Sequence, residues 1–167
     1  MANELFPNDH VIVSNADIWF NQTLYALKEK HLHHKFLALS RSKKMVDGSI
    51  KPRTTHAGGR KGNVSQDTWI FATPFTVDSN LDKVNVGTVH CEEHIVRAAR
   101  DVAKCRVYNP CLTLQCMHSH RIRIGHPKAS AYVQHEPLPH IKIDKVKYQS
   151  SENAMLPQPC TLEECES

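Results

Sequence analysis

The stretch from residue 90 to residue 116 constrains this chain more than any other, because it gathers residue types that are typical of metal sites. His90 and Glu92 stand in H-x-E spacing at the start of an apolar helical pattern. Pro110-Cys111 follows a short strand pattern, and Cys116 comes after four further residues. One His, two Cys and a nearby Glu that does not bind the metal form the inventory of a catalytic zinc site with an open fourth position. A Zn²⁺ ion held by His90, Cys111 and Cys116 is therefore our first hypothesis.

Hydrophobic periodicity around this stretch predicts both helices and strands. A capping-box pattern precedes the first helix, and Asp47-Gly48 predicts a hairpin turn whose returning strand is confined to a sheet edge by Pro52. Residues 57–63 must form a loop. The elements that we expect are helices at 16–30, 90–103 and 111–124 (or a helical loop), and strands at 34–40, 49–55, 69–75 (or a flap), 104–108, 128–134 and 140–148.

This order of elements predicts the α/β class. We expect a three-layer sandwich with a central mixed β-sheet flanked by helices. The length of 167 residues suits a single domain, which we place at residues 1–149. Residues 150–167 are polar, acidic and contain proline, and we expect a loosely ordered tail there.

Composition restricts the setting in which the chain works. The apolar content is 40%, and no apolar run approaches the length of a membrane-spanning helix. The first residues lack the basic and apolar regions of a signal peptide, so we expect a soluble, cytoplasmic protein, although the same sequence is compatible with secretion as part of a larger toxin. Six cysteines in such a chain favour thiols or metal ligands over disulfides, and twelve histidines raise the expectation of metal binding.

Basic residues concentrate between residues 28 and 61, although the net charge of the chain is only +4. Only Glu29 and Asp47 oppose them. Such a density of positive charge suits a polyanionic partner, and nucleic acid is the most common one. A solvated loop that carries lysines is the other interpretation. The ten basic residues are Lys28, Lys30, Lys35, Arg41, Lys43, Lys44, Lys51, Arg53, Arg60 and Lys61.

The chemistry of such a zinc site needs a group that moves protons. Zinc lowers the pKa of a water in its fourth position, and the resulting hydroxide is a nucleophile at neutral pH. Glu92 is two residues from the ligand His90 and suits the role of the proton carrier. We expect Cys111 and Cys116 to lie near exposed amides at a strand-to-helix junction, where thiolates are favoured.

These residues resemble the zinc-dependent deaminase superfamily, whose signature is H-x-E, then P-C, then a second Cys. By this resemblance His90, Cys111 and Cys116 are zinc ligands, Glu92 is the proton shuttle, and the reaction is hydrolytic deamination of a cytosine or adenine ring. Most members have two residues between the cysteines, whereas this chain has four. On a regular helix Cys111 and Cys116 would point about 140° apart, so the turn after Cys111 must be irregular if both bind the metal.

Within that superfamily, the chain looks most like the deaminase toxins of bacterial secretion systems, including those that act on DNA. The likeness rests on VHCEEHIVRAARD, VYNPC and HPKASAYV, and covers residues 34–135. It implies conversion of cytosine to uracil in nucleic acid, with DNA favoured over RNA, and an immunity protein as partner if the chain is a toxin domain. Deamination of free cytidine or deoxycytidylate is the alternative.

A deaminase that acts on an extruded or single-stranded base needs stacking surfaces beside its zinc. Asn63 could hydrogen-bond the sugar or the base, although an Asn after Gly is also typical of a turn. Trp69 and Phe71 also suit a buried core. The candidates for lining the pocket are His56, Trp69, Phe71, Phe75 and Tyr108.

Other ligand sets stay open. Cys91 and Glu93 have C-x-E spacing, which looks like the three-cysteine form of the free-cytidine deaminases, although helix packing favours the His90 register. His90 and His94 are one helical turn apart, and with two of Cys105, Cys111 and Cys116 they would form a closed structural zinc site in a non-catalytic nucleic-acid-binding module.

The P-C-x4-C spacing of Pro110 to Cys116 occurs a second time near the end of the chain. Pro159-Cys160 and Cys165 repeat it inside the expected acidic tail. No further element follows this repeat, and we interpret it as a coincidence.

Overall fold

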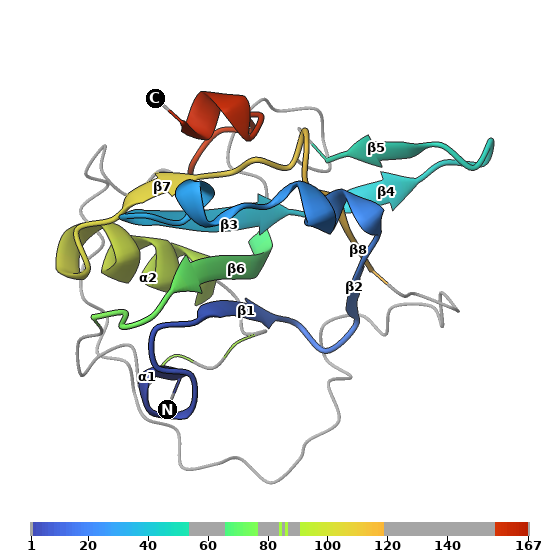
Figure 1. Ribbon diagram of the computed structural model, residues 1–167. Coiled ribbons are helices and arrows are strands. Elements are labelled where there is room, and N and C mark those ends of the chain that lie inside the picture. The colour runs from blue at the N-terminus through green and yellow to red at the C-terminus, as the bar shows by residue number, and fades with distance from the viewer. Residues whose placement is uncertain are drawn as a thin grey trace, which may run out of the picture. The chain divides into compact units, whose positions relative to one another are not determined.

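Two four-stranded sheets organise the part of the chain that the computed structural model describes, namely residues 2–53, 66–76, 84, 86, 91–118 and 156–166. These residues belong to one unit formed by residues 1–119 and 155–167. Sheet A has the order β1 (His10–Ser14), β6 (Gln66–Ala72), β3 (Lys35–Ser40), β7 (Arg106–Tyr108). Sheet B has the order β2 (Ile18–Phe20), β8 (Cys116–His118), β4 (Ser42–Lys44), β5 (Ile50–Pro52) (Figure 1).

Both sheets are mixed. In sheet A, β6 pairs antiparallel with β1 and with β3, whereas β3 and β7 are parallel. In sheet B, β8 pairs antiparallel with β2 and parallel with β4, and β4 and β5 form an antiparallel hairpin. The predicted α/β class with a mixed sheet is therefore confirmed at this level.

Sheet A is buried on both faces, because its central strands are continuous apolar runs. In β3, Phe36 and Ala38 face one side and Leu37 and Leu39 face the other, and all four are buried. Strand β6 is buried along most of its length, so the predicted strand at 69–75 is confirmed over 69–72 and extends back to residue 66. It is a central strand and not a flap.

One face of sheet A carries the helix-side core. Helix α2 (Cys91–Arg97) continues into a π-helical turn, Ala98–Val102 (η4), and this confirms the predicted second helix over residues 91–102. Cys91, Val96 and Ala99 pack there against residues of β3 and β6 (Figure 1). The rings of Phe36, Phe71 and Phe75 fill this core, with centroids 4.7 to 5.6 Å apart.

The other face of sheet A carries a second core, which we call the opposite core. Three short 3-10 helices contribute to its cover: η1 (Gln22–Ala26), η2 (Glu29–His31) and η7 (Glu163–Cys165). Leu24 and Leu27 pack there from η1 and its C-cap, and Leu162 and Cys165 pack there from the C-terminal segment. Residues far apart in sequence thus meet on Leu37, Leu39 and Ile70 of the sheet.

The predicted helix at residues 16–30 is wrong, because a strand and two 3-10 helices occupy this stretch. Ile18 and Phe20 pack on the opposite core while Trp19 between them is exposed, which is the alternation of a strand. Asn21 then caps η1 by accepting a hydrogen bond from the Thr23 amide at 3.0 Å. Branched and aromatic side chains at 18–20 favour an extended backbone and override the helical spacing of the leucines.

The hairpin at Asp47-Gly48 is confirmed. The Met45 amide donates to the Ser49 carbonyl at 2.7 Å, and Gly48 has a φ of 83°, which a side chain would disfavour. The returning strand is short, and Pro52 ends it on the edge of sheet B as expected. The expected loop at 57–63 and strands at 128–134 and 140–148 lie outside the described residues.

Residues 111–124 were expected to form a third helix or a helical loop, and the helix is wrong for the described part. Residues 111–114 form a turn, and Cys116 begins β8. The irregular turn that the four-residue spacing requires is therefore present, although no helix follows it within the described residues up to 118. Residues beyond 118 in this prediction lie outside the described part of the chain.

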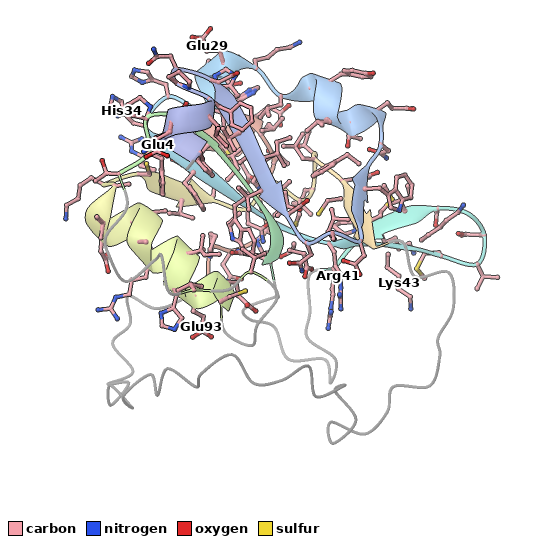
Figure 2. The ribbon with its side chains drawn as sticks, turned by 90° about the horizontal axis from the view of Figure 1, so that it is seen from below. Glu4, Glu29, His34, Arg41, Lys43 and Glu93 are labelled. Carbon is pink, nitrogen blue, oxygen red and sulfur yellow. The ribbon has the colours of Figure 1, made fainter. Side chains whose placement is uncertain are left out.

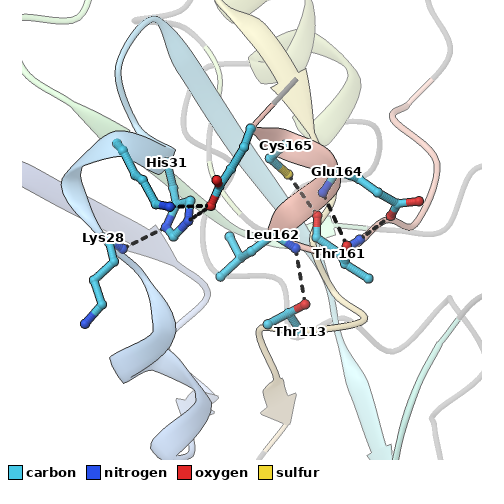
Figure 3. A network of polar contacts seen from close by, with 9 residues as sticks. Lys28, His31, Thr113, Thr161, Leu162, Glu164 and Cys165 are labelled. Carbon is cyan, nitrogen blue, oxygen red and sulfur yellow. Dashed lines mark hydrogen bonds and ion pairs between the residues drawn. The ribbon is translucent and has the colours of Figure 1, made fainter.

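The expected loosely ordered tail is wrong for residues 156–166. Leu156, Leu162 and Cys165 are buried, and the segment hydrogen-bonds to residues 109–113. Its last turn is also held from η2, because Lys30 Nζ and His31 Nε2 lie 2.8 and 3.0 Å from Glu166 Oε1 (Figure 3). These two partners lower the pKa of the Glu166 carboxyl. We call residues 156–166 the C-terminal clip.

Candidate active site

The candidate site lies where the parallel strands of sheet A end. Strand β3 ends at Ser40 and β7 at Tyr108, and parallel strands bring their carboxyl ends to the same edge of a sheet. Only residues 103–105 separate η4 from β7, so α2 runs back along the sheet and its first turn, with Glu92, points toward that same edge. Glu92 of the first motif half and Pro110-Cys111 of the second therefore approach one edge of the sheet.

Asn109 ties this edge together, and sequence analysis did not single it out. Its Oδ1 accepts from the Ser40 amide at 3.0 Å, and its Nδ2 donates to Ser40 Oγ at 2.9 Å and to the Pro157 carbonyl at 3.4 Å. The side chain is buried. It therefore fixes the end of β3, the end of β7 and the C-terminal clip relative to one another, directly before Pro110-Cys111.

The two predicted cysteine ligands are both fully buried at this edge. Burial raises the pKa of Cys111 to about 12, with further contributions from Cys160 and Cys116, so Cys111 lies within electrostatic reach of both. Burial also raises the pKa of Cys116 to about 11, and the Thr68 hydroxyl partly opposes this. The protein alone therefore favours neutral thiols, and the expectation of thiolates set by the protein environment is wrong.

Cys116 packs in the opposite core, and its Sγ lies 3.7 Å from the carbonyl oxygen of Ser40. Because Ser40 is the last residue of β3, this contact places Cys116 at the strand end and not deep under the sheet. Helix α2 lies on the other face. A metal that joins Cys116 to a ligand on α2 would therefore sit beyond the end of β3.

The first turn of α2 carries the predicted acid. Glu92 is half-buried, and Cys91 Sγ donates to its Oε2 at 3.6 Å. Cys91 itself is buried in the helix-side core, which is the place of a packed apolar thiol and agrees better with the His90 register than with Cys91 as a ligand. His90 lies outside the described residues, so its predicted role stays a prediction.

The predicted stacking residues fall into three groups. Trp69, Phe71 and Phe75 are buried in the helix-side core, and their predicted role in lining the pocket stays a prediction. Tyr108 is half-buried beside the site, with Lys35 Nζ 6.0 Å from its ring centroid. His56 and Asn63 lie outside the described residues.

Buried polar side chains at the start of β6 form part of the edge that sequence analysis missed. Gln66 pairs with Ser40 across a register shift, and its side chain is 2% exposed. Neither amide atom of Gln66, nor Ser42 Oγ, finds a hydrogen-bond partner among the described residues. The sequence does contain a signal, namely the polar run Gln66-Asp67-Thr68 directly before the apolar residues of the strand. Polar side chains at buried positions need hydrogen-bond partners, and such a run therefore indicates a candidate site.

The predicted basic region divides between two ends of β3. Lys28, Lys30 and Lys35 lie at its start, whereas Arg41 and the lysines of the β4–β5 hairpin follow its end. Figure 2 shows Arg41 and Lys43 on the same side of the view as Glu93, with Glu29 and His34 on the other side. Since β4 pairs with β8, positive charge lies directly beside the strand that begins with Cys116. This hairpin group consists of Arg41, Lys43, Lys44, Lys51 and Arg53; Arg60 and Lys61 lie outside the described residues.

The closed structural zinc site is not assembled by the described side chains. It needs both His90 and His94 with two of three cysteines. Cys105 contacts the Ala103 carbonyl and packs beside the helix-side core, and His90 lies outside the described residues. In the described ranges, no group of three His, Cys, Asp or Glu side chains is placed to hold a metal ion. That result applies to His94 with two of the cysteines, because all of these residues are described. It does not apply to a set that includes His90.

A second cysteine pair lies next to the candidate ligands. Cys160 is half-buried, Cys165 is buried, and their Sγ atoms are 3.7 Å apart. The Asn109 carbonyl accepts from the Cys160 amide at 2.9 Å, and the Leu112 amide donates to the Cys160 carbonyl at 3.2 Å. The two copies of P-C-x4-C therefore lie side by side. Their identical spacing was interpreted as a coincidence, and their proximity in the fold was missed for that reason.

Comparison of the chain with known protein families, with curated proteins and with solved structures finds no match. In the described part of the chain, no helix has the length and apolar character needed to cross a membrane.

Proposed function

We propose that this protein is a zinc-dependent hydrolytic deaminase that converts cytosine to uracil in nucleic acid. The observation that carries the proposal is the placement of the two motif halves: Glu92 lies in the first turn of α2, and Pro110-Cys111 directly follows β7 at the edge toward which that turn points. An acid on a helix start and thiols after a parallel strand are the arrangement that the chemistry needs.

The donor set fits zinc. Two buried thiols lie within electrostatic reach of each other, and a cation is what would favour their ionised forms in a buried place. Cys111 and Cys116 would hold the ion together with His90. Zinc bound there would supply a Lewis acid that makes water nucleophilic at neutral pH.

Glu92 would move the proton. Its carboxylate would accept a proton from the attacking water and deliver it to the exocyclic nitrogen of the base, so that cytosine and water become uracil and ammonia. Its position in the first turn of α2, at the edge where Pro110-Cys111 follows β7, suits this role.

One feature of the described residues supports nucleic acid over a free nucleotide. The hairpin group places positive charge beside β8, where a phosphate backbone would run past the site.

Glu92→Gln tests the proposal. Zinc-loaded protein should convert cytosine to uracil in DNA or RNA oligonucleotides, read by sequencing of the incubated pools. The variant should lose at least about a thousandfold in rate and keep its zinc, because the carboxamide cannot carry the proton. Glu93→Gln is the matched control and should keep activity within a few fold.

The substrate panel separates the alternatives. Activity on cytidine or deoxycytidylate without activity on oligonucleotides would move the proposal to the small-molecule branch. Absence of deamination on every substrate by zinc-loaded protein, or full activity in Glu92→Gln, would show that the enzyme proposal is wrong.

A further inference from the structure

The cysteine pair of the C-terminal clip has no role in the proposed deamination. Cys165 lies in the opposite core, and Cys160 lies at its margin with part of its surface open to solvent. Their sulfur atoms face each other at 3.7 Å, and all six cysteines of the chain are free thiols. Both residues lie in the described part of the chain, so this pair is independent of the placement of His90.

The backbone around the pair is held on several sides. The Leu162 amide donates to Thr113 Oγ1 at 3.2 Å, and the Cys165 amide donates to the Leu162 carbonyl at 3.0 Å. Cys165 Sγ lies 3.1 Å from the Thr161 carbonyl, so its position is fixed on the turn (Figure 3). Together with the hydrogen bonds of Cys160 to residues 109 and 112, these contacts keep the two sulfurs neighbours.

Little movement separates the pair from a covalent bond. A disulfide needs its sulfur atoms at about 2.05 Å, so they must approach by about 1.7 Å. Rotation of the half-exposed Cys160 side chain toward Cys165 can supply this while the backbone hydrogen bonds of the clip stay in place. Only the contact of the Cys165 thiol with the Thr161 carbonyl is lost, because a disulfide sulfur has no proton to donate.

We propose that Cys160 and Cys165 form a redox-active dithiol, which closes to an intramolecular disulfide by exchange with a low-molecular-weight disulfide. The proposal does not rest on the deaminase function. Cys160, the accessible thiol, attacks one sulfur of the small disulfide and expels one small thiolate, which takes up a proton. Cys165 then attacks the Cys160 sulfur of this mixed disulfide and releases the second small thiol. The protein loses two electrons and two protons, and the small disulfide gains them.

Closure of this ring fastens the turn that pairs with the segment 109–113. That segment carries Cys111, so oxidation at the clip would preserve the backbone around a candidate zinc ligand while leaving Cys111 reduced. The competing event is a disulfide between Cys160 and Cys111, because Cys111 lies within electrostatic reach of Cys160. Such a link would consume the zinc ligand instead.

Trypsin separates these outcomes. The last basic residue is Lys147, so one peptide, 148–167, carries Cys160 and Cys165, and another, 107–121, carries Cys111 and Cys116. The full chain is treated with oxidised glutathione, and its remaining thiols are alkylated under denaturing conditions. The masses of the tryptic peptides are then measured by mass spectrometry. We expect peptide 148–167 to lose two hydrogens and both alkylation sites at a lower oxidant concentration than any other cysteine reacts.

Variants sharpen the test. Cys165→Ser should leave Cys160 trapped as its glutathione adduct, whereas Cys160→Ser should leave Cys165 alkylated and without glutathione, because Cys165 is buried. Cys105→Ser is the matched control and should not change the closure of peptide 148–167. A digest in which 148–167 keeps two alkylated thiols while Cys105 is modified, or in which it is joined to 107–121, would overturn the proposal.

Discussion

Asn109 is the residue through which β3, β7 and the C-terminal clip are joined. Its one side chain satisfies a buried amide of Ser40, a hydroxyl and a carbonyl. An Asn at this position therefore does more than end a strand, since each of its polar atoms has a defined partner. In the sequence it was only one letter of the segment VYNPC.

We expect Asn109→Ala to lower the free energy of unfolding by about 3 kcal/mol, because the Ser40 amide then stays buried without an acceptor. Ser40→Ala removes only the hydroxyl contact and should cost about 1 kcal/mol. Urea unfolding of both variants and of the double variant measures the coupling. Additivity of the two effects within about 0.5 kcal/mol would contradict the direct contact between these side chains.

The buried thiols set the pH dependence of zinc binding. The pKa values of Cys111 and Cys116 are raised to about 12 and about 11, so both are protonated at pH 7 and 8. Binding zinc must release both protons, and higher pH therefore favours binding. An imidazole with an ordinary pKa of about 6.5 adds little above pH 7.

We expect zinc affinity to rise about a hundredfold from pH 7 to pH 8, which corresponds to two protons released per ion. Competition with a chelator of known proton linkage measures this slope. Cys116→Ser should bring it to about one proton, whereas Cys105→Ser should leave it at two. A slope near zero in the unmodified chain would show that these two thiols do not hold the ion.

At the scale of elements, the β4–β5 hairpin links the basic region to the candidate site. The exposed Lys43, Lys44 and Lys51 belong to this short hairpin, which β4 attaches to β8. Its register comes from the Asp47-Gly48 turn, and sequence pattern predicted it because turn chemistry is local. That this hairpin lies beside β8, the strand that begins with Cys116, follows only from the parallel pairing of Ser42 with Met117, which is not local.

We expect the triple change of Lys43, Lys44 and Lys51 to Gln to weaken binding of a single-stranded oligonucleotide. The slope of log affinity against log salt should fall by about 2, at about 0.7 for each phosphate that a lysine no longer neutralises. The matched control changes Lys28, Lys30 and Lys35 to Gln, which removes the same charge at the other end of β3. Fluorescence anisotropy over a salt series compares the two, and equal weakening by both would argue for a diffuse charge effect without a binding surface at the hairpin.

At the scale of the whole molecule, sequence predicted what local pattern determines. The buried strand β3, the hairpin and the helix at α2 follow from apolar runs, turn residues and helical spacing. The stretch 16–30 failed because Ile18, Phe20, Leu24 and Leu27 meet one core from a strand and a 3-10 helix, and their spacing fits both structures. A helix does not form over the described part of 111–124, because Leu114 and Cys116 pack in the opposite core. Of the candidate site, the helix start and the strand end were predicted, whereas Asn109 and Gln66 acquire their roles only through long-range contacts.

The packing of the C-terminal clip was also not predictable from local sequence, because its few buried apolar residues stand among acidic and polar ones. Leu162 is 3% exposed, and it packs on the opposite core between a threonine and two exposed glutamates. We expect Leu162→Ala to lower the free energy of unfolding by about 3 kcal/mol, as removal of a buried leucine does, and to lower the melting temperature by about 9 °C.

Glu163→Ala, one residue away and exposed, is the control and should change the melting temperature by less than about 2 °C. Both variants are followed by thermal unfolding of the full chain, with far-ultraviolet circular dichroism at 20 °C to show that each is folded. If the clip were loosely ordered, as its composition suggested, the two variants would melt together. A separation between them therefore tests whether residues 156–166 belong to the core, because only the leucine contributes apolar area to it.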